Sequence, residues 1–283
     1  MSVKIITDST SYIPKEYIEK YNISIVSLNV VLNGKSYREV DLENNFFYKE
    51  MDKCSSIPTS SQPSVEEFYN IFENIVKNGD DIVGLFISSE MSGTYSTANL
   101  VKNMILENYP DRKVEIIDSR SNCMQMGFAA IEGARTAKEE KDISSVVENI
   151  NSVINTSRFL FVPDTLDYLK KGGRIGGAAA LFGAILQIRP ILTVENGVTT
   201  VLNKVRTKKK AVDKIVETVI NDVTNKGIGK MIVHHINCEE EGKELANRLK
   251  EKLNIEIDIQ SIGPIIGLHV GPKSIGVAYY TEK

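Results

Sequence analysis

Short apolar runs of strand length alternate with segments of helical periodicity along the first half of this sequence. The clearest strand is predicted at Asp81–Ser88, because its middle, from Ile82 to Ile87, is apolar on both faces. This alternation predicts a parallel sheet with helices on both of its faces. The other predicted strands are Val3–Thr7, Ile23–Leu32, Lys35–Val40, Val114–Ile117 and Arg158–Val162. The predicted helices are Ile13–Tyr21, a segment that begins at Ser64, Ser92–Asn108, Met124–Lys138 and Ile143–Thr156.

The second half of the chain has a different pattern, in which a hairpin precedes alternating helices and strands. Asn-Gly pairs favour tight hairpin turns, and they occur at Asn33-Gly34 and Asn196-Gly197. We therefore predict an α/β domain over residues 1–162 and a smaller α+β domain over 163–283, with the boundary near Pro163. The predicted helices are Leu166–Lys171, Ala178–Ile188, Lys208–Asn225 and Glu239–Lys252. The predicted strands are Ile191–Val194, Val198–Arg206, Lys230–His235, Ile255–Ile259 and Ser274–Tyr280.

Charge and cysteine content exclude some classes of protein and indicate the cellular compartment. The 34 basic and 37 acidic residues leave a formal charge of −3, which argues against a dedicated nucleic-acid-binding protein. The 3 scattered cysteines are typical of reduced thiols in a cytoplasmic protein. The N-terminus does not have the pattern of a signal peptide, and the apolar stretch from Ala178 to Leu186 is too short to span a bilayer. We expect a cytoplasmic protein without a transmembrane segment.

Hydroxyl side chains follow three of the predicted strands. Ser9-Thr10, Ser88-Ser89 and Ser119 each stand where a strand ends. Ligands of open α/β sheets bind outside the carboxyl ends of the strands, so these hydroxyls are expected to meet at a site.

Two further segments are rich in hydrogen-bond donors. The turn Ser92-Gly93-Thr94 lies between a buried strand and a helix, where freed backbone N–H groups can hold a carboxylate or phosphate; an ordinary helix cap is the alternative. Thr59, Ser60 and Ser61 lie in a proline-bounded loop before Ser64, which starts a capping box with Glu67; these hydroxyls could instead simply be solvated. Neither segment matches a P-loop or a dinucleotide-binding loop.

The histidines and a basic loop are the remaining candidates. His269 is flanked by glycines in a predicted loop, whereas the spacing of His234 and His235 does not suit a zinc site. Arg174 lies in a basic, glycine-rich loop that could close over an anion, present the arginine to a partner, or simply cap the preceding helix.

Together these segments resemble the DegV family, bacterial fatty-acid-binding proteins that serve as the lipid subunit of fatty acid kinase. The similarity spans almost the whole chain in the right order. It is carried by Ile6–Thr10, Thr59–Ser64, Met91–Tyr95, Asp118-Ser119, Tyr168–Ile175, Lys204–Thr207 and Gly267–Pro272.

The resemblance implies an N-terminal α/β domain of the DegV type and a C-terminal α+β domain, with the acyl chain buried between them. It implies that Ser60 and Ser92 hold the fatty-acid carboxylate, that His269 lies near it, and that Arg174 and Arg206 engage the kinase subunit. Ser61, Gly93 and Thr94 would support the ligand loop. Two departures stand out: Ser60 replaces the family's usual threonine, and Lys273 replaces a small residue.

The expected function is therefore that of a binding protein with no catalytic residue, metal or cofactor of its own. It would bury a fatty acid of roughly 14–18 carbons in a tunnel, with a gain of about 0.8 kcal/mol per methylene. Neutral hydroxyls would leave the carboxylate nucleophilic, so that an ATP-dependent partner kinase could convert it to acyl-phosphate for phospholipid synthesis. Transient contact with a membrane is also expected.

Two alternatives stay open from the residues alone. Ser92 and His269, with Asp8 or Asp118, could form a hydrolase triad, although the sequence lacks a GxSxG elbow. A regulatory module that senses a metal or a nucleotide is the other.

Overall fold

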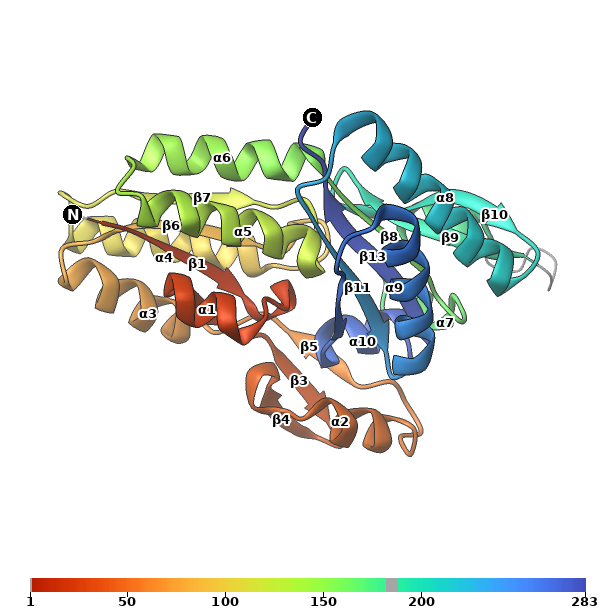
Figure 1. The fold of residues 1–283 in the computed structure, drawn as a ribbon. Helices are drawn as coiled ribbons and strands as arrows, with labels where there is room; N and C mark the ends of the chain where they lie inside the picture. The colour runs from red at the N-terminus through yellow and green to blue at the C-terminus, as the bar shows by residue number, and fades with distance from the viewer. Residues whose placement is uncertain (1, 182–187) are drawn as a thin grey trace.

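The computed structural model describes residues 2–181 and 188–283. Within these residues the first sheet has four parallel strands in the order β2-β1-β6-β7 (Figure 1). This confirms the predicted parallel sheet. Its strands are β1 Val3–Asp8, β2 Ser24–Val26, β6 Asp81–Phe86 and β7 Val114–Asp118.

Helices cover both faces of this sheet, as the alternation predicts. On one face, α3 (Val65–Lys77) and α4 (Thr94–Asn108) enclose an apolar core that includes Phe68, Phe72 and Phe86. On the other face lie α5 (Cys123–Lys138) and α6 (Ile143–Thr156), with α1 (Lys15–Tyr21) packed against α5 (Figure 1).

Six strands of the described chain form a second sheet in the order β10-β9-β8-β13-β11-β12. All of its pairs are antiparallel except β11 with β12. Helices α8 (Lys208–Lys226) and α9 (Glu239–Leu253) cover one face, and the other face packs against α5. The two halves of the molecule therefore share one core. The strands are β8 Ser157–Val162, β9 Arg189–Glu195, β10 Val198–Val205, β11 Lys230–Ile236, β12 Asp258–Ser261 and β13 Ser274–Tyr280.

The predicted strand Ile23–Leu32 is wrong as a single strand, because it is divided between two sheets. Its first part, β2, belongs to the parallel sheet, and its second part, β3 (Asn29–Leu32), pairs with β4 (Lys35–Arg38) and β5 (Thr59–Ser61) in a small separate sheet. The break falls at Leu28, whose N–H donates to the Ser9 hydroxyl instead of continuing the ladder. The hairpin at Asn33-Gly34 is confirmed, and both residues have positive φ.

Other differences are local. After β4 the chain forms the 3-10 turn η2 (Glu39–Asp41) and then α2 (Asn44–Met51), which the pattern did not predict. The strand predicted at 255–259 begins only at Asp258. Of the predicted helix Ala178–Ile188, the part up to Leu181 is the 3-10 turn η3 (Gly176–Leu181), and residues 182–187 lie outside the described residues.

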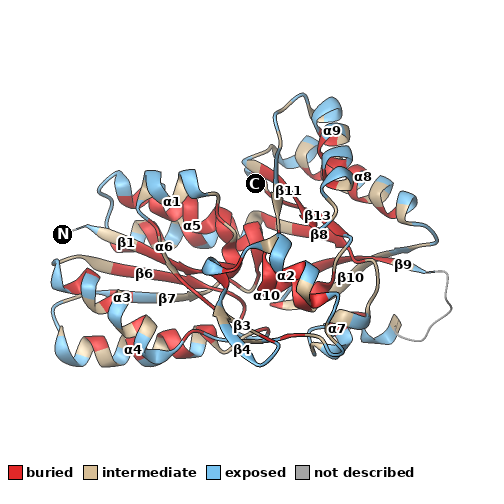
Figure 2. Ribbon diagram, turned by 90° about the horizontal axis from the view of Figure 1, so that it is seen from below, coloured by how far each residue is buried: buried red, intermediate tan, exposed pale blue. Residues whose placement is uncertain are grey.

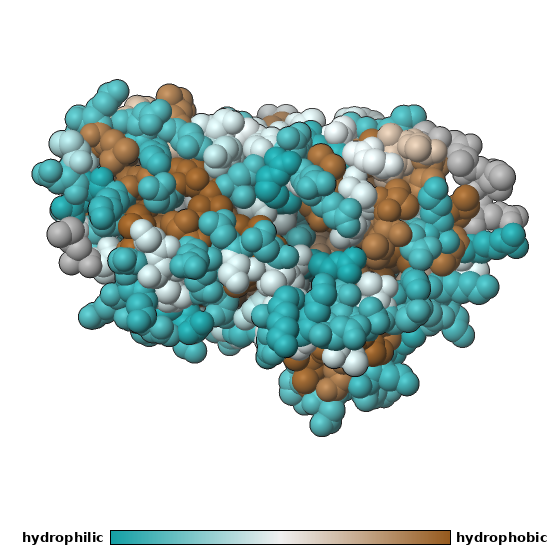
Figure 3. All heavy atoms as spheres, turned by 90° about the horizontal axis from the view of Figure 1, so that it is seen from above, coloured by the Kyte–Doolittle hydropathy of each residue, from teal (hydrophilic) through white to brown (hydrophobic). Residues whose placement is uncertain are grey.

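The domain boundary near Pro163 stays a prediction, but sheet membership changes earlier. Strand β8, which that boundary leaves in the first domain, lies between β9 and β13 in the second sheet. In the described parts of the chain, no helix combines the length and hydropathy needed to cross a membrane. On the face drawn in Figure 3, hydrophilic side chains predominate and the apolar ones form separate patches.

The short helix α10 (Pro264–Val270) joins the two halves and is buried along most of its length (Figure 2). The Tyr48 hydroxyl of α2 donates to the Ile262 carbonyl oxygen at 2.9 Å, just before the helix begins. Gly267 permits this close approach, because a Cβ there would lie 1.9 Å from the Tyr48 hydroxyl oxygen. Helix α10 therefore depends on a residue without a side chain at this contact.

We predict that Gly267→Ala lowers the free energy of unfolding by about 1–3 kcal/mol, because the added methyl group overpacks the contact with Tyr48. Thermal or urea unfolding measures this change. Gly177→Ala is the control, since a Cβ at Gly177 meets backbone atoms only at 3.7 Å or more. Equal stability of the two variants would show that α10 is not packed against α2 in this way.

Candidate ligand site

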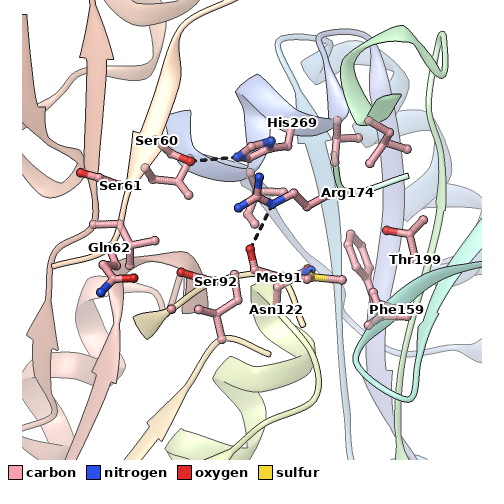
Figure 4. A pocket seen from close by; sticks show the side chains of 18 of the residues that line it. Ser60, Ser61, Gln62, Met91, Ser92, Asn122, Phe159, Arg174, Thr199 and His269 are labelled. Atoms are coloured by element: carbon pink, nitrogen blue, oxygen red, sulfur yellow. Dashed lines mark hydrogen bonds between the residues drawn. The ribbon is translucent and has the colours of Figure 1, made fainter. Parts of the chain in front are cut away.

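A cavity of about 370 Å³ lies where the two halves of the molecule meet. This volume is within the range of roughly 300–1,000 Å³ that is typical of small-molecule sites. Apolar side chains from β8, the β9–β10 hairpin and α10 line much of its wall. Several polar side chains lie toward one side, whereas Thr199 lies on the other, beside Phe159 (Figure 4). The apolar residues include Leu28, Ile87, Phe159, Phe161, Leu169, Val194, Ile265, Ile266 and Val270.

Ser60 and His269 face each other across the polar side of the cavity. The Ser60 hydroxyl oxygen lies 2.9 Å from His269 Nε2 (Figure 4). Ser60 is on the edge strand β5, and His269 is on α10, so the prediction that His269 lies in a loop is wrong. Burial, together with the positive charge of Arg174, lowers the pKa of His269 to about 4. The ring is therefore neutral at pH 7.

Ser92 and Gly93 contribute to the same cavity from the start of α4. The residue at the N-cap of this helix is Gly93, which rules out the alternative that Ser92 is the cap, although the Ser92 hydroxyl oxygen accepts from the Thr94 N–H at 3.3 Å. The Ser92 hydroxyl instead lies 2.8 Å from that of Thr94, which is buried behind it and is not among the described residues that line the cavity. Gly93 packs against Gln62, leaving no room for a Cβ.

Arg174 also lines this cavity, beside His269. Its Nε donates to the Met91 carbonyl oxygen at 3.0 Å, and its Nη1 donates to the Gly172 carbonyl oxygen at 2.7 Å (Figure 4). A positive charge therefore borders the polar side, in addition to the neutral hydroxyls. Arg206 lies elsewhere, exposed just after β10.

A second, outer groove of about 530 Å³ adjoins the cavity and shares Ser60, Arg174 and His269 with it. The wall of the groove also contains Ser55, Ser56, Thr59 and Lys171. The polar side of the inner cavity and the outer groove therefore meet at the three residues that they share.

The comparisons with known proteins agree with this architecture. The family model described as "Uncharacterised protein, DegV family" matches residues 2–282. The chain belongs to the DegV family. A DegV domain-containing protein of Clostridium perfringens is 55% identical over 282 residues, with 100% of each chain covered.

Solved DegV-family structures are similar over the same length. A stearic acid-binding protein from Eubacterium ventriosum matches with a TM-score of 0.91 and 28% identity, covering 99% of this chain and 98% of the other. DegV of Bacillus subtilis, described as a fatty acid binding protein, matches with a TM-score of 0.89 and 31% identity, covering 99% of each chain.

In this DegV-family chain, the hydroxyls at the strand ends do not line the described cavity, which corrects that expectation. The Ser9 hydroxyl donates to the Glu39 carboxylate, Ser88 to the Gly197 carbonyl oxygen, and Ser119 to the Ser121 carbonyl oxygen. They satisfy polar groups that the buried loops would otherwise leave unpaired. These residues hold the loops in place.

Sequence reasoning missed several lining residues, among them Gln62, Met91, Asn122 and Thr199. Phe159 and Phe161 are two positions apart on β8, so the strand prediction already placed them on one face. For Asn122 and Thr199 there was no signal, because each comes from an element whose contact with the cavity depends on tertiary packing.

The groups of the hydrolase triad are not assembled within the described chain. The hydroxyl near His269 Nε2 is that of Ser60, and Nδ1 of the same ring has no hydrogen-bond partner there. Asp8 accepts from Thr10 and Ile87, and Asp118 accepts from Ser89 and Arg120. The imidazole therefore lacks an orienting carboxylate and is too weakly basic to act at pH 7. No group of three or more His, Cys, Asp or Glu side chains that could hold a metal occurs among the described residues.

We predict that His269 stays uncharged as the pH is lowered from 8 to 5, because its buried ring resists protonation until about pH 4. Imidazole ¹⁵N NMR, with the signal assigned by its loss in His269→Gln, measures the titration directly. A midpoint near the ordinary value of about 6.5 would contradict the burial of the ring.

Proposed function

We propose that the chain binds a long-chain fatty acid, with the acyl tail in the inner cavity and the carboxylate at its polar side. The observation that carries this proposal is one cavity with a largely apolar wall, in which Ser60, Ser92, His269 and Arg174 lie toward the same side. An amphipathic acid needs this arrangement, because its tail gains from burial and its head needs donors. The stearic acid-binding and fatty acid binding relatives support the same ligand class.

The hydrogen bonds define how the head would be held. His269 Nδ1 is buried without a partner, so the tautomer with the proton on Nε2 leaves the fewest buried donors unpaired. Nε2–H then donates to the Ser60 hydroxyl oxygen, and the Ser60 proton is free to point to the ligand. The Ser92 hydroxyl would be the second donor, with Gly93 and Ser61 beside it in the cavity wall and Thr94 behind Ser92. Arg174 would supply charge without leaving its carbonyl partners.

Presentation to a kinase is the second part of the proposal. The head group would lie between the inner cavity and the outer groove, where an ATP-dependent partner could reach a carboxylate oxygen while the tail stays buried. The product would be an acyl-phosphate that feeds phospholipid synthesis. The chain would act as the lipid-binding subunit, because its sequence has no P-loop of its own.

Denaturing extraction of the purified protein, followed by mass spectrometry, tests the ligand. We expect about one fatty acid of roughly 14–18 carbons per chain, since each buried methylene adds about 0.8 kcal/mol. The double variant Ser60→Ala/Ser92→Ala should retain much less, because each lost bond to a carboxylate weakens binding by about tenfold or more. Ser89→Ala, whose hydroxyl bonds Asp118 outside the cavity, is the control. A folded wild-type protein that yields no fatty acid and takes up none would overturn the proposal.

Kinase docking is tested by charge reversal at two arginines. Arg206 is exposed and lies outside the described cavity lining, so Arg206→Glu should leave fatty-acid affinity unchanged and reduce phosphorylation by the partner kinase. Arg174→Glu should weaken both, because its guanidinium borders the polar side of the cavity. Calorimetry and a kinase assay separate the two effects. Full phosphorylation of the Arg206→Glu protein would remove Arg206 from the docking surface.

A further inference from the structure

Two buried carboxylates, those of Glu39 and Asp8, accept from the backbone N–H groups of the cavity residues Ile265 and Ile87. Neither carboxylate contributes to the proposed binding of the fatty acid. Glu39 is only 5% exposed and Asp8 is fully buried. Among the described residues, the hydrogen bonds to Glu39 come from neutral donors: Ser9 Oγ at 2.5 Å, Tyr12 Oη at 2.8 Å and the Ile265 N–H at 2.8 Å. A buried carboxylate without a cationic partner is costly, so its place calls for an explanation.

Glu39 holds the first turn of α10. One of its oxygens, Oε1, accepts both from Tyr12 and from the Ile265 N–H, while the Tyr12 hydroxyl oxygen accepts from the Ile266 N–H at 3.2 Å. Gly263, at the N-cap, packs so closely that a Cβ there would lie 2.9 Å from the same oxygen. Ile265, Ile266 and His269 all line the cavity. Glu39 therefore fixes the helix that carries these residues and Val270, four of the residues that line the cavity.

The polar side of the cavity begins at His269, about one turn of α10 after Ile265. Ile265 and His269 are four residues apart, which is roughly 6 Å along a helix axis. With the hydrogen bonds at each end, a carboxylate held beside His269 would lie roughly 12 Å from Glu39. Two negative charges at that distance in a protein interior repel each other measurably.

We propose that Glu39 is a positioning residue for the fatty-acid site, and that its carboxyl group takes up a proton when an anionic ligand binds. This inference rests on the proposed function, because it requires a ligand with a negative charge.

Asp8 is the neighbour of Glu39 whose pKa lies nearest to 7, and the other groups around Glu39 titrate far from it. Burial raises the pKa of Glu39 to about 7 and that of Asp8 to about 6. Burial also raises the pKa values of Tyr12, Tyr48 and Cys123 well above their ordinary values, and lowers that of His269 to about 4. On its own segment, Arg38 and Asp41 are exposed and pair with each other. A change of charge between pH 6.5 and 8 near α10 therefore comes mainly from Glu39, with a smaller part from Asp8.

The direction of the effect follows from linkage. A bound anion raises the pKa of Glu39 further, so the complex holds more protons than the empty protein near pH 7. Affinity therefore falls as the pH rises through about 7. At roughly 12 Å, an effective dielectric constant between 20 and 80 corresponds to about a two- to tenfold loss.

The experiment compares the wild-type protein with Glu39→Gln and Glu39→Ala, using calorimetry with myristic acid below its aggregation limit at pH 6.5 and 8.0. Gln keeps an acceptor for Tyr12 and Ile265 and can donate to Ser9, so this variant should bind without the Glu39-dependent loss. Ala removes the acceptor for the three donors of Ser9, Tyr12 and Ile265, so this variant should bind more weakly at both pH values. Titration of the fatty acid itself changes the affinity of every variant equally, so it cancels when their pH profiles are compared. Glu132→Gln, another buried glutamate that lies on α5 outside the described cavity lining, is the control and should keep the wild-type pH profile.

Each outcome has one meaning. A wild-type loss of affinity between pH 6.5 and 8.0 that exceeds that of Glu39→Gln by about 1.5- to fourfold, the part of the full effect that falls within this interval, supports the inference. Equal pH profiles of these two proteins overturn it. If Glu39→Gln does not fold, proton uptake by the wild-type protein on binding at pH 7, measured in buffers of different ionisation enthalpy, replaces the comparison, and zero uptake overturns the inference. If the wild-type protein binds no fatty acid at either pH, the proposed function itself fails.

Discussion

The docking of α10 onto the N-terminal half is the contact on which the rest of the site depends. The helix belongs by sequence to the second half of the chain, yet its first turn is held by Glu39, Tyr12 and Tyr48 of the first half. This contact closes the cavity on the side of α10, while α5 packs the second sheet against the first half. The buried Glu39 carboxylate is costly, but three neutral donors offset much of that cost because hydrogen bonds to an ionised acceptor are strong. Close packing at Gly263 and Gly267 then leaves the helix little freedom to shift.

This docking explains why the polar side of the cavity is assembled from distant segments. Ser60 comes from the edge strand of the small sheet, Ser92 from the loop after β6, and His269 from α10, while Arg174 follows α7 (Asp167–Lys171). Each segment is fixed by a different set of contacts. The polar side forms only when both halves are in place. Its geometry therefore depends on the packing between the halves and is not set by any one motif.

Local patterns in the sequence predicted most of the elements, and long-range contacts account for the failures. Apolar periodicity was sufficient for β6 and α6, and Asn-Gly was sufficient for the hairpins, because those signals act within a few residues. The split of Ile23–Leu32 depends on the Ser9 hydroxyl, and α10 was taken for a loop because its glycines oppose a helix in isolation. Ser60, Ser92 and His269 could be named from the resemblance, whereas Glu39 has no sequence signal at all, since only the fold brings it to Ile265.

The placement of Arg174 changes the physical picture of the head group. Neutral hydroxyls alone would have to desolvate a carboxylate without any compensating charge, which is unfavourable in an apolar cavity. Arg174 is exposed, and its Nε and Nη1 already donate to two carbonyl oxygens. It therefore adds positive charge where the cavity meets the outer groove. It does so without the tight bidentate bond that would immobilise both carboxylate oxygens. The charged and polar side chains named above therefore lie where the cavity meets the outer groove, away from its apolar wall. For the ligand proposed above, burial of the tail and solvation of the head then favour the same orientation, with the carboxylate toward the outer groove, and no specific contact with the tail is needed to set it.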